Sequence, residues 1–210
     1  MASDPLQPEG GWAGPLQARL EVPPPSERGL LFRAVSRISH LFGRPELPAV
    51  FPLLHRNPRL FWGWLFFASR LMPWGRLAAP ARELVILRTA WLCRSRYEWG
   101  QHVEIAERVG VVDRDIIAVT RGPEAFSNAT LRTLIQACDE LHQQDCLSDD
   151  TWRQLQIRHS DSQLLEIMML VGHYRMLAGV LISCGLPLEA RMEDNLKAFH
   201  ARIRSLIQTD

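Results

Sequence analysis

Three ionisable side chains stand among aliphatic and aromatic residues in the segment 82–111, and their types could support acid and base chemistry. They are Glu83, Glu98 and His102, within the sequence RELVILRTAWLCRSRYEWGQHVEIAERVGV. A carboxylate removed from water prefers to be protonated, and two neighbouring carboxylates do not both ionise easily. Such a cluster would separate the proton affinities of its members, which is the setting for general acid and base catalysis near neutral pH.

Helical spacing would turn these three side chains toward the interior. In a helix over 97–109, Glu98 and His102 share one face with apolar residues of the same helix. In a preceding helix over 81–93, Glu83 also lies on an apolar face. A turn between the two helices would fold them together, so the three groups could converge.

The same residues also allow a purely structural interpretation. Glu98 and His102 have the i, i+4 spacing of an ordinary helical pair, and Glu83 could pair with a neighbouring arginine such as Arg82. A metal site needs three or four ligands, and only Glu83 or His173 could join Glu98 and His102. We therefore expect no metal.

The fold class that the sequence predicts is all-α. Three-to-four spacing of apolar residues recurs along the chain, and no stretch shows sustained alternation between hairpin turns. The predicted helices cover Glu27–Leu41, Leu47–His55, Pro58–Met72, Ala81–Cys93, Tyr97–Val109, Asp113–Val119, Glu124–Gln144, Ser148–Ile157, Ser162–Cys184 and Leu188–Gln208. Asp113 is predicted to cap its helix, Ser160 and Gln163 to form a capping box, and Gly185 to end the long helix before it.

The long helix 162–184 carries two further candidate residues. His173 lies on a stripe with Glu166 and several leucines, and Tyr174 follows it near the centre of the helix. A lone histidine on such a face is usually a core residue, so His173 and Tyr174 are weaker candidates for substrate contact than the cluster above.

Length and composition predict one domain over 26–210, preceded by a flexible arm over 1–25 that contains six prolines. The arm could also lie over a neighbouring subunit. It has neither the basic start nor the apolar stretch of a secretory signal. The chain has 24 Lys and Arg against 23 Asp and Glu, so bulk attraction of nucleic acid or anionic membrane is not expected. We expect a cytoplasmic protein.

The most hydrophobic run, LFWGWLFFASRLM over 60–72, is interrupted by Arg70 and is too short to cross a bilayer. It predicts a buried or interfacial helix, part of which could face a partner chain. The cysteines Cys93, Cys138, Cys146 and Cys184 never approach C-x-x-C spacing, and we expect them to be reduced thiols.

The segment 82–111 resembles the carboxymuconolactone decarboxylase family, which includes the alkylhydroperoxidase D-like (AhpD-like) proteins. DELHQQDCLSDDTWRQL and LLEIMMLVGHYRMLAGVLISCGLPLE fit the same pattern, and the resemblance covers roughly residues 45–190. In the peroxidase branch a Glu is followed after twelve residues by a Cys, after three more by a second Cys, and after four more by a His. These four motif positions hold Glu83, Ser95, Glu98 and His102 here.

The spacing of the motif is kept and both of its cysteines are replaced. Peroxide reduction needs a reactive thiolate and a resolving thiol, and Ser95 and Glu98 supply neither. Resemblance to the decarboxylase-like branch instead implies a thiol-independent enzyme that moves protons on a small carboxylated, lactone or enone-like substrate, without a cofactor. His102 would be the acid/base group, Glu83 its orienting partner, and Glu98 a second carboxyl that tunes or shares the proton.

The predicted substrate-binding residues are Ser95, Tyr97, Trp99, His173 and Tyr174, of which Ser95 and Tyr97 could donate to a developing oxyanion. The resemblance also implies an AhpD-like helical bundle that self-associates as a dimer, trimer or hexamer. Two other functions stay open at this point: a redox peroxidase or disulfide reductase, and a family member that has lost catalysis and binds a ligand.

Overall fold

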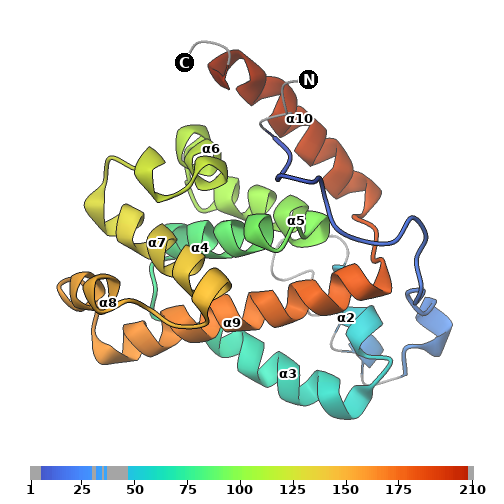
Figure 1. Cartoon of the computed structure of the whole chain (residues 1–210). Helices are drawn as coiled ribbons and strands as arrows, with labels where there is room; N and C mark the ends of the chain where they lie inside the picture. Colours follow the sequence, from blue (N-terminus) through green and yellow to red (C-terminus); the bar gives the residue numbers. More distant parts are fainter. Residues whose placement is uncertain (1–5, 30–31, 35, 37–46, 208–210) are drawn as a thin grey trace.

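The computed structural model describes residues 6–29, 32–34, 36 and 47–207, and within these ranges every regular element is a helix (Figure 1). The elements are η1 Pro25–Glu27, α2 Val50–Leu54, α3 Pro58–Leu71, α4 Ala79–Leu92, α5 Arg96–Arg108, α6 Asp113–Arg121, η3 Pro123–Ala125, α7 Ala129–Gln144, α8 Asp149–Gln156, α9 Asp161–Cys184 and α10 Ala190–Ile207. The all-α prediction is confirmed. Most of the predicted helix Glu27–Leu41 lies outside the described residues.

Helix α4 is the centre of the bundle. It packs against α5, α6, α7 and α9, and residues 82–91 are all buried. Leu84 and Leu87 belong to a core shared with α5, α6 and α10, whereas Val85 and Ile86 belong to a second core shared with α7 and α9. Because α4 has no wet side along this stretch, each charged group on it needs a partner inside the protein.

A three-residue turn, Cys93–Ser95, joins α4 to α5. Arg94 takes a left-handed conformation with a φ of 56°, and the Ser95 N–H donates to the Ala90 carbonyl at 2.8 Å. Since so short a connection leaves little freedom, α5 returns alongside α4. The turn was predicted one residue later, over 94–96.

Local signals fixed several helix ends correctly. The Ser160–Gln163 capping box and the left-handed stop at Gly185, with a φ of 66°, are both confirmed. The predicted cap at Asp113 is wrong, because Asp113 is already helical and its carboxylate binds Arg202 of α10 instead.

Helix α7 begins at Ala129, later than the predicted Glu124. Pro123–Ala125 form a separate 3-10 turn, and Phe126 is extended and buried. The side chain of Asn128 then accepts hydrogen bonds from the first N–H groups of α7. Asn128 therefore caps α7 at Ala129, which explains why the helix predicted from Glu124 begins five residues later.

The described part of the N-terminal arm packs against its own chain. The Ala13 N–H donates to the Arg94 carbonyl at 2.9 Å, and the Arg19 N–H donates to the Cys184 carbonyl at 2.8 Å. These two bonds hold residues 13–19 against the α4–α5 turn and the end of α9. This segment is part of the predicted flexible arm.

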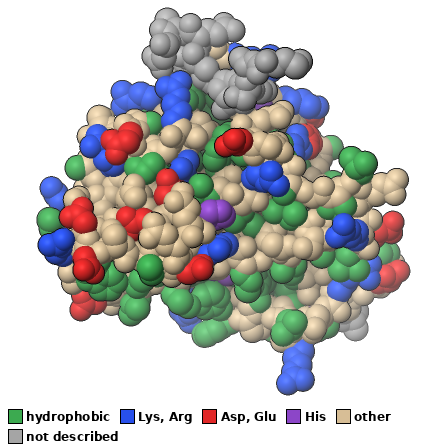
Figure 2. All heavy atoms as spheres, in the orientation of Figure 1, with side chains coloured by type: hydrophobic (Ala, Val, Ile, Leu, Met, Phe, Trp, Pro, Cys, Tyr) green, Lys and Arg blue, Asp and Glu red, His purple; other side chains and the backbone are tan. Residues whose placement is uncertain are grey.

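By length and composition, α9 is the one described helix that could cross a membrane, with a mean hydropathy of 1.6. It contacts α3, α4, α7 and α8, as a core helix does. Its outer side and the neighbouring α3 nevertheless expose large apolar side chains, including Leu60, Phe66, Leu165, Met169 and Met176. Figure 2 shows hydrophobic side chains gathered over the part of this face where α9 and α3 run.

Candidate active site

Glu83 and His102 form a buried pair between α4 and α5. The distance from His102 Nδ1 to Glu83 Oε2 is 2.7 Å, and the two residues are 7% and 0% exposed. Arg82 donates to the other oxygen of Glu83 from Nε at 3.1 Å and from Nη2 at 3.0 Å. A carboxylate can only accept, so Nδ1 of His102 carries the proton that it donates. The Nε2 atom is therefore the ring nitrogen that can exchange a proton with a ligand.

Glu98 lies one helical turn before His102 and has an unusual environment. It is 2% exposed, and neither of its carboxyl oxygens has a hydrogen-bond partner. Burial raises the pKa of Glu98 from 4.5 to about 8, and the nearby Ser95 hydroxyl offsets part of the rise without making a hydrogen bond of ordinary geometry. The carboxyl of Glu98 thus keeps its proton near neutral pH.

The raised pKa of Glu98 agrees with the sequence-based expectation, which gave two causes, removal from water and crowding by a second carboxyl. Removal from water is the dominant cause at Glu98, and a second carboxyl is not among the causes. The structural alternative also holds in part, since Glu83 does pair with Arg82. Glu98 and His102, in contrast, do not form the expected i, i+4 pair, because His102 turns to Glu83.

Helix α9 adds His173 and Tyr174 to the same region. The Tyr174 ring meets the His102 ring edge to face at 5.0 Å between centroids. Burial, followed by the charges of Glu83 and Glu98, raises the pKa of Tyr174 well above its ordinary value. Tyr174 is therefore a neutral wall beside His102.

His173 is also neutral, because burial, followed by the charge of His102, lowers its pKa to about 4. Its ring stacks on Trp64 at 6.0 Å and meets Phe67 edge to face at 5.5 Å. His173 Nδ1 and Trp64 Nε1 are buried without hydrogen-bond partners. Buried polar atoms are rarely left unpaired outside functional sites. His173 contacts Tyr174, which contacts His102, so these unpaired atoms favour a ligand-binding role for this region.

Two predicted substrate contacts are held by other parts of the chain. The hydroxyl of Tyr97 donates to Glu189 at 2.8 Å. Trp99 packs with Trp12 of the arm and with Trp91, at centroid distances of 6.1 and 5.0 Å. Both side chains thus support the fold around the cluster. Glu166, on the same stripe as His173, accepts the backbone N–H groups of Arg76 and Leu77 and holds the turn before α4.

Sequence reasoning missed Trp64 and Phe67 as part of the cluster. They lie three residues apart in the apolar run 60–72, which indicated only a buried or partner-facing helix. Contact between α3 and α9, which is not local in sequence, brings them to His173.

The cysteines do not provide a reactive thiolate at this site. The four cysteines are free, as expected, and Cys93 lies closest to the motif in sequence. Burial, and then the charge of Glu98, raises the pKa of Cys93 to about 11. Its sulfur is 3.8 Å from His142 Nδ1, a residue outside the motif. Within the described residues, no group of three or more His, Cys, Asp and Glu side chains is placed to hold a metal ion.

Residues 58–139 match the model of the Carboxymuconolactone decarboxylase family, and this segment contains all four motif positions. No curated protein matches the sequence.

Solved structures share the fold at low identity. A cysteine-to-alanine variant of the debrominase Bmp8, in complex with 2,3,4-tribromopyrrole, is 14% identical, with a TM-score of 0.73 over 88% of this chain and 98% of that chain. An uncharacterized peroxidase-related protein from Silicibacter sp. TM1040 is 12% identical, with a TM-score of 0.74 over 85% of this chain and 95% of that chain. An AhpD-core, peroxidase-related protein from Ralstonia eutropha JMP134 is 15% identical, with a TM-score of 0.71 over 86% and 96%. The segment 58–139 is therefore similar to the carboxymuconolactone decarboxylase family, and the chain has the helical fold of AhpD-like proteins.

Proposed function

We propose that this protein is a thiol-independent acid/base enzyme that acts on a small carboxylated, lactone or enone-like substrate. The observation that carries the proposal is the buried, unpaired carboxyl of Glu98, which holds a proton near neutral pH beside an oriented histidine. A neutral acid one helical turn from a base is an arrangement that can support proton transfer at carbon.

The base in this mechanism is Nε2 of His102. It removes a proton from the carbon next to a carbonyl, and the imidazolium that forms is stabilised by the Glu83 carboxylate at Nδ1. Arg82 balances the charge of Glu83 in the resting state, so the pair need not be broken when the ring becomes charged.

The acid is Glu98. As the electron pair left on carbon moves toward the carbonyl, the Glu98 O–H donates to the developing enolate oxygen. Return of the His102 proton to a different carbon completes an isomerisation. In a decarboxylation no carbon is deprotonated first: the C–CO₂ bond breaks, its electron pair moves toward the carbonyl, and a His102 ring that is protonated before the reaction gives its Nε2 proton to the carbon. Both outcomes use the same two groups, and the substrate decides between them.

Two further observations support this assignment over peroxide chemistry. Both motif cysteines are replaced, and the pKa of Cys93 is too high for a thiolate nucleophile. The debrominase Bmp8, which has the same fold, is solved with a small flat ring, 2,3,4-tribromopyrrole. A flat unsaturated substrate would also suit the aromatic walls that Tyr174, His173 and Trp64 form here. Self-association remains a prediction of the family resemblance, and a cytoplasmic location remains a prediction from the sequence.

The test measures turnover of a panel of lactones, β-keto acids and unsaturated acids. Turnover is detected as release of CO₂ or as isomerisation of the compound. His102→Ala should reduce turnover about 10²- to 10⁴-fold, the usual value of a positioned acid or base, with helical content and oligomer size unchanged. The matched control is His159→Ala, since His159 lies after α8 and outside the cluster. Normal turnover by the His102→Ala protein would refute the proposal.

The pH profile of the same reaction provides an independent check. Activity should fall as pH rises through about 8, where Glu98 loses its proton. Glu98→Gln should lower turnover and remove this limb of the profile. If the parent turns over nothing in the panel, and Glu83→Gln and His102→Ala proteins are at least as stable as the parent, the non-catalytic alternative is favoured instead.

A further inference from the structure

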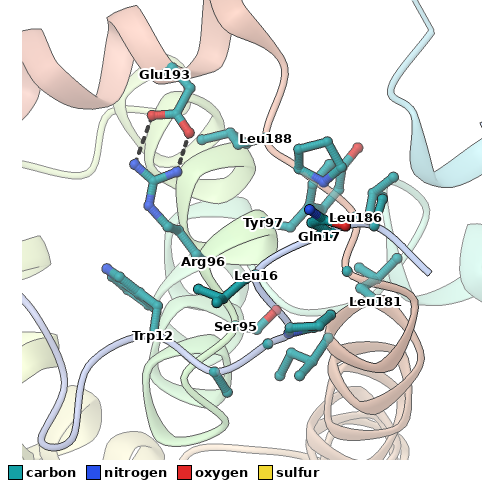
Figure 3. Close-up of a pocket in the computed structure, with 17 residues that line it drawn as sticks. Trp12, Leu16, Gln17, Ser95, Arg96, Tyr97, Leu181, Leu186, Leu188 and Glu193 are labelled. Atoms are coloured by element: carbon teal, nitrogen blue, oxygen red, sulfur yellow. Dashed lines mark hydrogen bonds and ion pairs between the residues drawn. The ribbon is translucent and has the colours of Figure 1, made fainter. Parts of the chain in front are cut away.

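A cavity of about 270 Å³ lies between the N-terminal arm and the start of α5 (Figure 3). Arm residues 12–18 form one side of it. The cap and first turn of α5, residues 95–97, form the second side, and the end of α9 with the segment up to Leu188 forms the third. Of the four motif positions, only Ser95 lines this cavity.

We propose that this cavity binds the substrate, a small organic acid or carbonyl compound with an apolar body, and that arm residues 12–18 are the lid that closes over it. The inference rests on the function proposed above and names where its substrate is held.

Ser95 supplies the polar contact at this site. It is 0% exposed, its hydroxyl has no hydrogen-bond partner, and its side chain does not cap α5, although it occupies the cap position. The first N–H groups of a helix lack partners within the helix and attract oxygen atoms with negative charge. The Ser95 hydroxyl is buried while the arm is in place, so a carbonyl or carboxylate oxygen of the ligand would accept from it only once the arm lifts.

This position also brings the ligand next to the proposed acid. Glu98 is in the same turn of α5, and its carboxyl is close enough to Ser95 for the hydroxyl to affect its pKa. A ligand oxygen bound by Ser95 would therefore lie beside the Glu98 O–H. Ser95 lines the cavity and lies in the same turn of α5 as Glu98, so it stands between the cavity and the buried cluster.

The other walls select for an apolar body. Leucine side chains of α9 and of the segment after it, including Leu181, Leu186 and Leu188, line the cavity (Figure 3). Arg96 at the rim is paired with Glu193, with 2.7 Å between Nη2 and Oε2, so its charge is already balanced. The volume is below the roughly 300–1,000 Å³ of sites for drug-sized molecules. The cavity therefore fits a compact ligand with one oxygen-bearing end.

The arm has the construction of a movable cover. Backbone hydrogen bonds fix it at Ala13 and Arg19, and residues 14–18 span the cavity between these two points. Trp12 anchors the near end against Trp91 and Trp99. Gly14 has a φ of 139°, a conformation that favours glycine, at the start of the span. Release of Trp12 would lift the span and open the cavity.

The experiment measures binding of sorbate, a flat six-carbon unsaturated carboxylate, by calorimetry at neutral pH. The matched ligand is 2,4-hexadien-1-ol, which has the same body without the carboxylate. Sorbate should bind the parent, and the alcohol should bind at least fivefold more weakly. Ser95→Ala should weaken sorbate binding by about five- to tenfold, the value of one hydrogen bond, and should fold normally because the hydroxyl makes no bond within the chain.

Leu186→Trp, which fills the cavity, should weaken sorbate binding by at least tenfold, and Trp12→Ala should speed sorbate release at least threefold. The control Ser127→Ala, at an exposed position outside the cavity, should bind sorbate as the parent does. No sorbate binding by the parent at millimolar concentration, or equal binding by Ser95→Ala and the parent, would overturn the inference.

His102→Ala separates this inference from the proposed function, because His102 does not line the cavity. If that variant binds sorbate within twofold of the parent and loses turnover, both proposals hold. If His102→Ala turns over substrate normally and the cavity variants weaken sorbate binding, the acid/base assignment alone is wrong. If His102→Ala loses turnover but Ser95→Ala and Leu186→Trp bind sorbate as the parent does, the cavity inference alone is wrong.

Discussion

Replacement of Glu98 by glutamine should change how the stability of this protein depends on pH. Burial raises the pKa of Glu98 from 4.5 to about 8 in the folded chain. Between these two values, the folded chain keeps a proton that the unfolded chain has released. The stability that Glu98 contributes is therefore fully present below about pH 4.5 and is lost as pH rises to about 8.

The magnitude follows from the interval between the two pKa values. It covers about 3.5 pH units, and at ~1.4 kcal/mol for each unit the loss is about 5 kcal/mol at most. Glutamine has nearly the same shape and no charge at any pH. As pH rises through this interval, the free energy of unfolding of the parent should fall relative to that of the Glu98→Gln protein. The difference should amount to several kcal/mol.

Urea denaturation followed by circular dichroism, at four pH values between about 5 and 8, measures this difference. Glu124→Gln is the control, since Glu124 is exposed and its replacement should leave the pH dependence of the parent unchanged. A constant difference between the Glu98→Gln protein and the parent at all four pH values would refute the reasoning, because it would mean that folding does not change the proton affinity of Glu98.

Three other outcomes are expected. Arg82→Ala should lower the free energy of unfolding by about 3–5 kcal/mol, because it leaves the buried carboxylate of Glu83 without its cation; a change below about 1 kcal/mol in urea denaturation would contradict this. The pKa of His173 is about 4, so its ring NMR signals should not move between about pH 8 and pH 5, and its cost to stability should appear only as pH falls from 6.5 toward 4. Iodoacetamide should modify exposed Cys146 well before Cys93, whose pKa of about 11 keeps its thiol protonated; preferential labelling of Cys93, detected by peptide mass spectrometry, would argue for a reactive thiolate.

Helical spacing located most of the fold and the central part of the candidate site. The three-to-four pattern identified α3, α4, α5, α8 and α9 to within a few residues, because apolar residues recur at helical spacing along these segments. The same pattern placed Glu83, Glu98 and His102 on inward faces, and all three are buried. Helical spacing alone did not reveal that His102 pairs with Glu83, because that choice depends on how α5 is rotated against α4, although the family resemblance had implied Glu83 as the orienting partner of His102.

Residues whose surroundings come from distant parts of the chain were harder to interpret. The hydroxyl of Tyr97 was predicted to donate to the substrate, but it donates to the carboxylate of Glu189, just before α10. Trp99 meets Trp12 of the arm, a segment expected to be flexible. Periodicity gives the face on which a side chain lies, whereas its partner is decided by packing between elements that are far apart in sequence.

The connection between α4 and α5 is constrained more in its length than in its composition. Arg94 is the residue there with a positive φ, and a glycine would adopt that conformation at a lower cost. One inserted residue, however, would shift the register of α5 and rotate it by about 100° about its axis. That rotation would carry His102 away from Glu83 and present a solvent-facing side of α5 in its place. We therefore expect relatives that keep this pair to tolerate substitutions at 93 and 94 and to exclude insertions or deletions across 93–95.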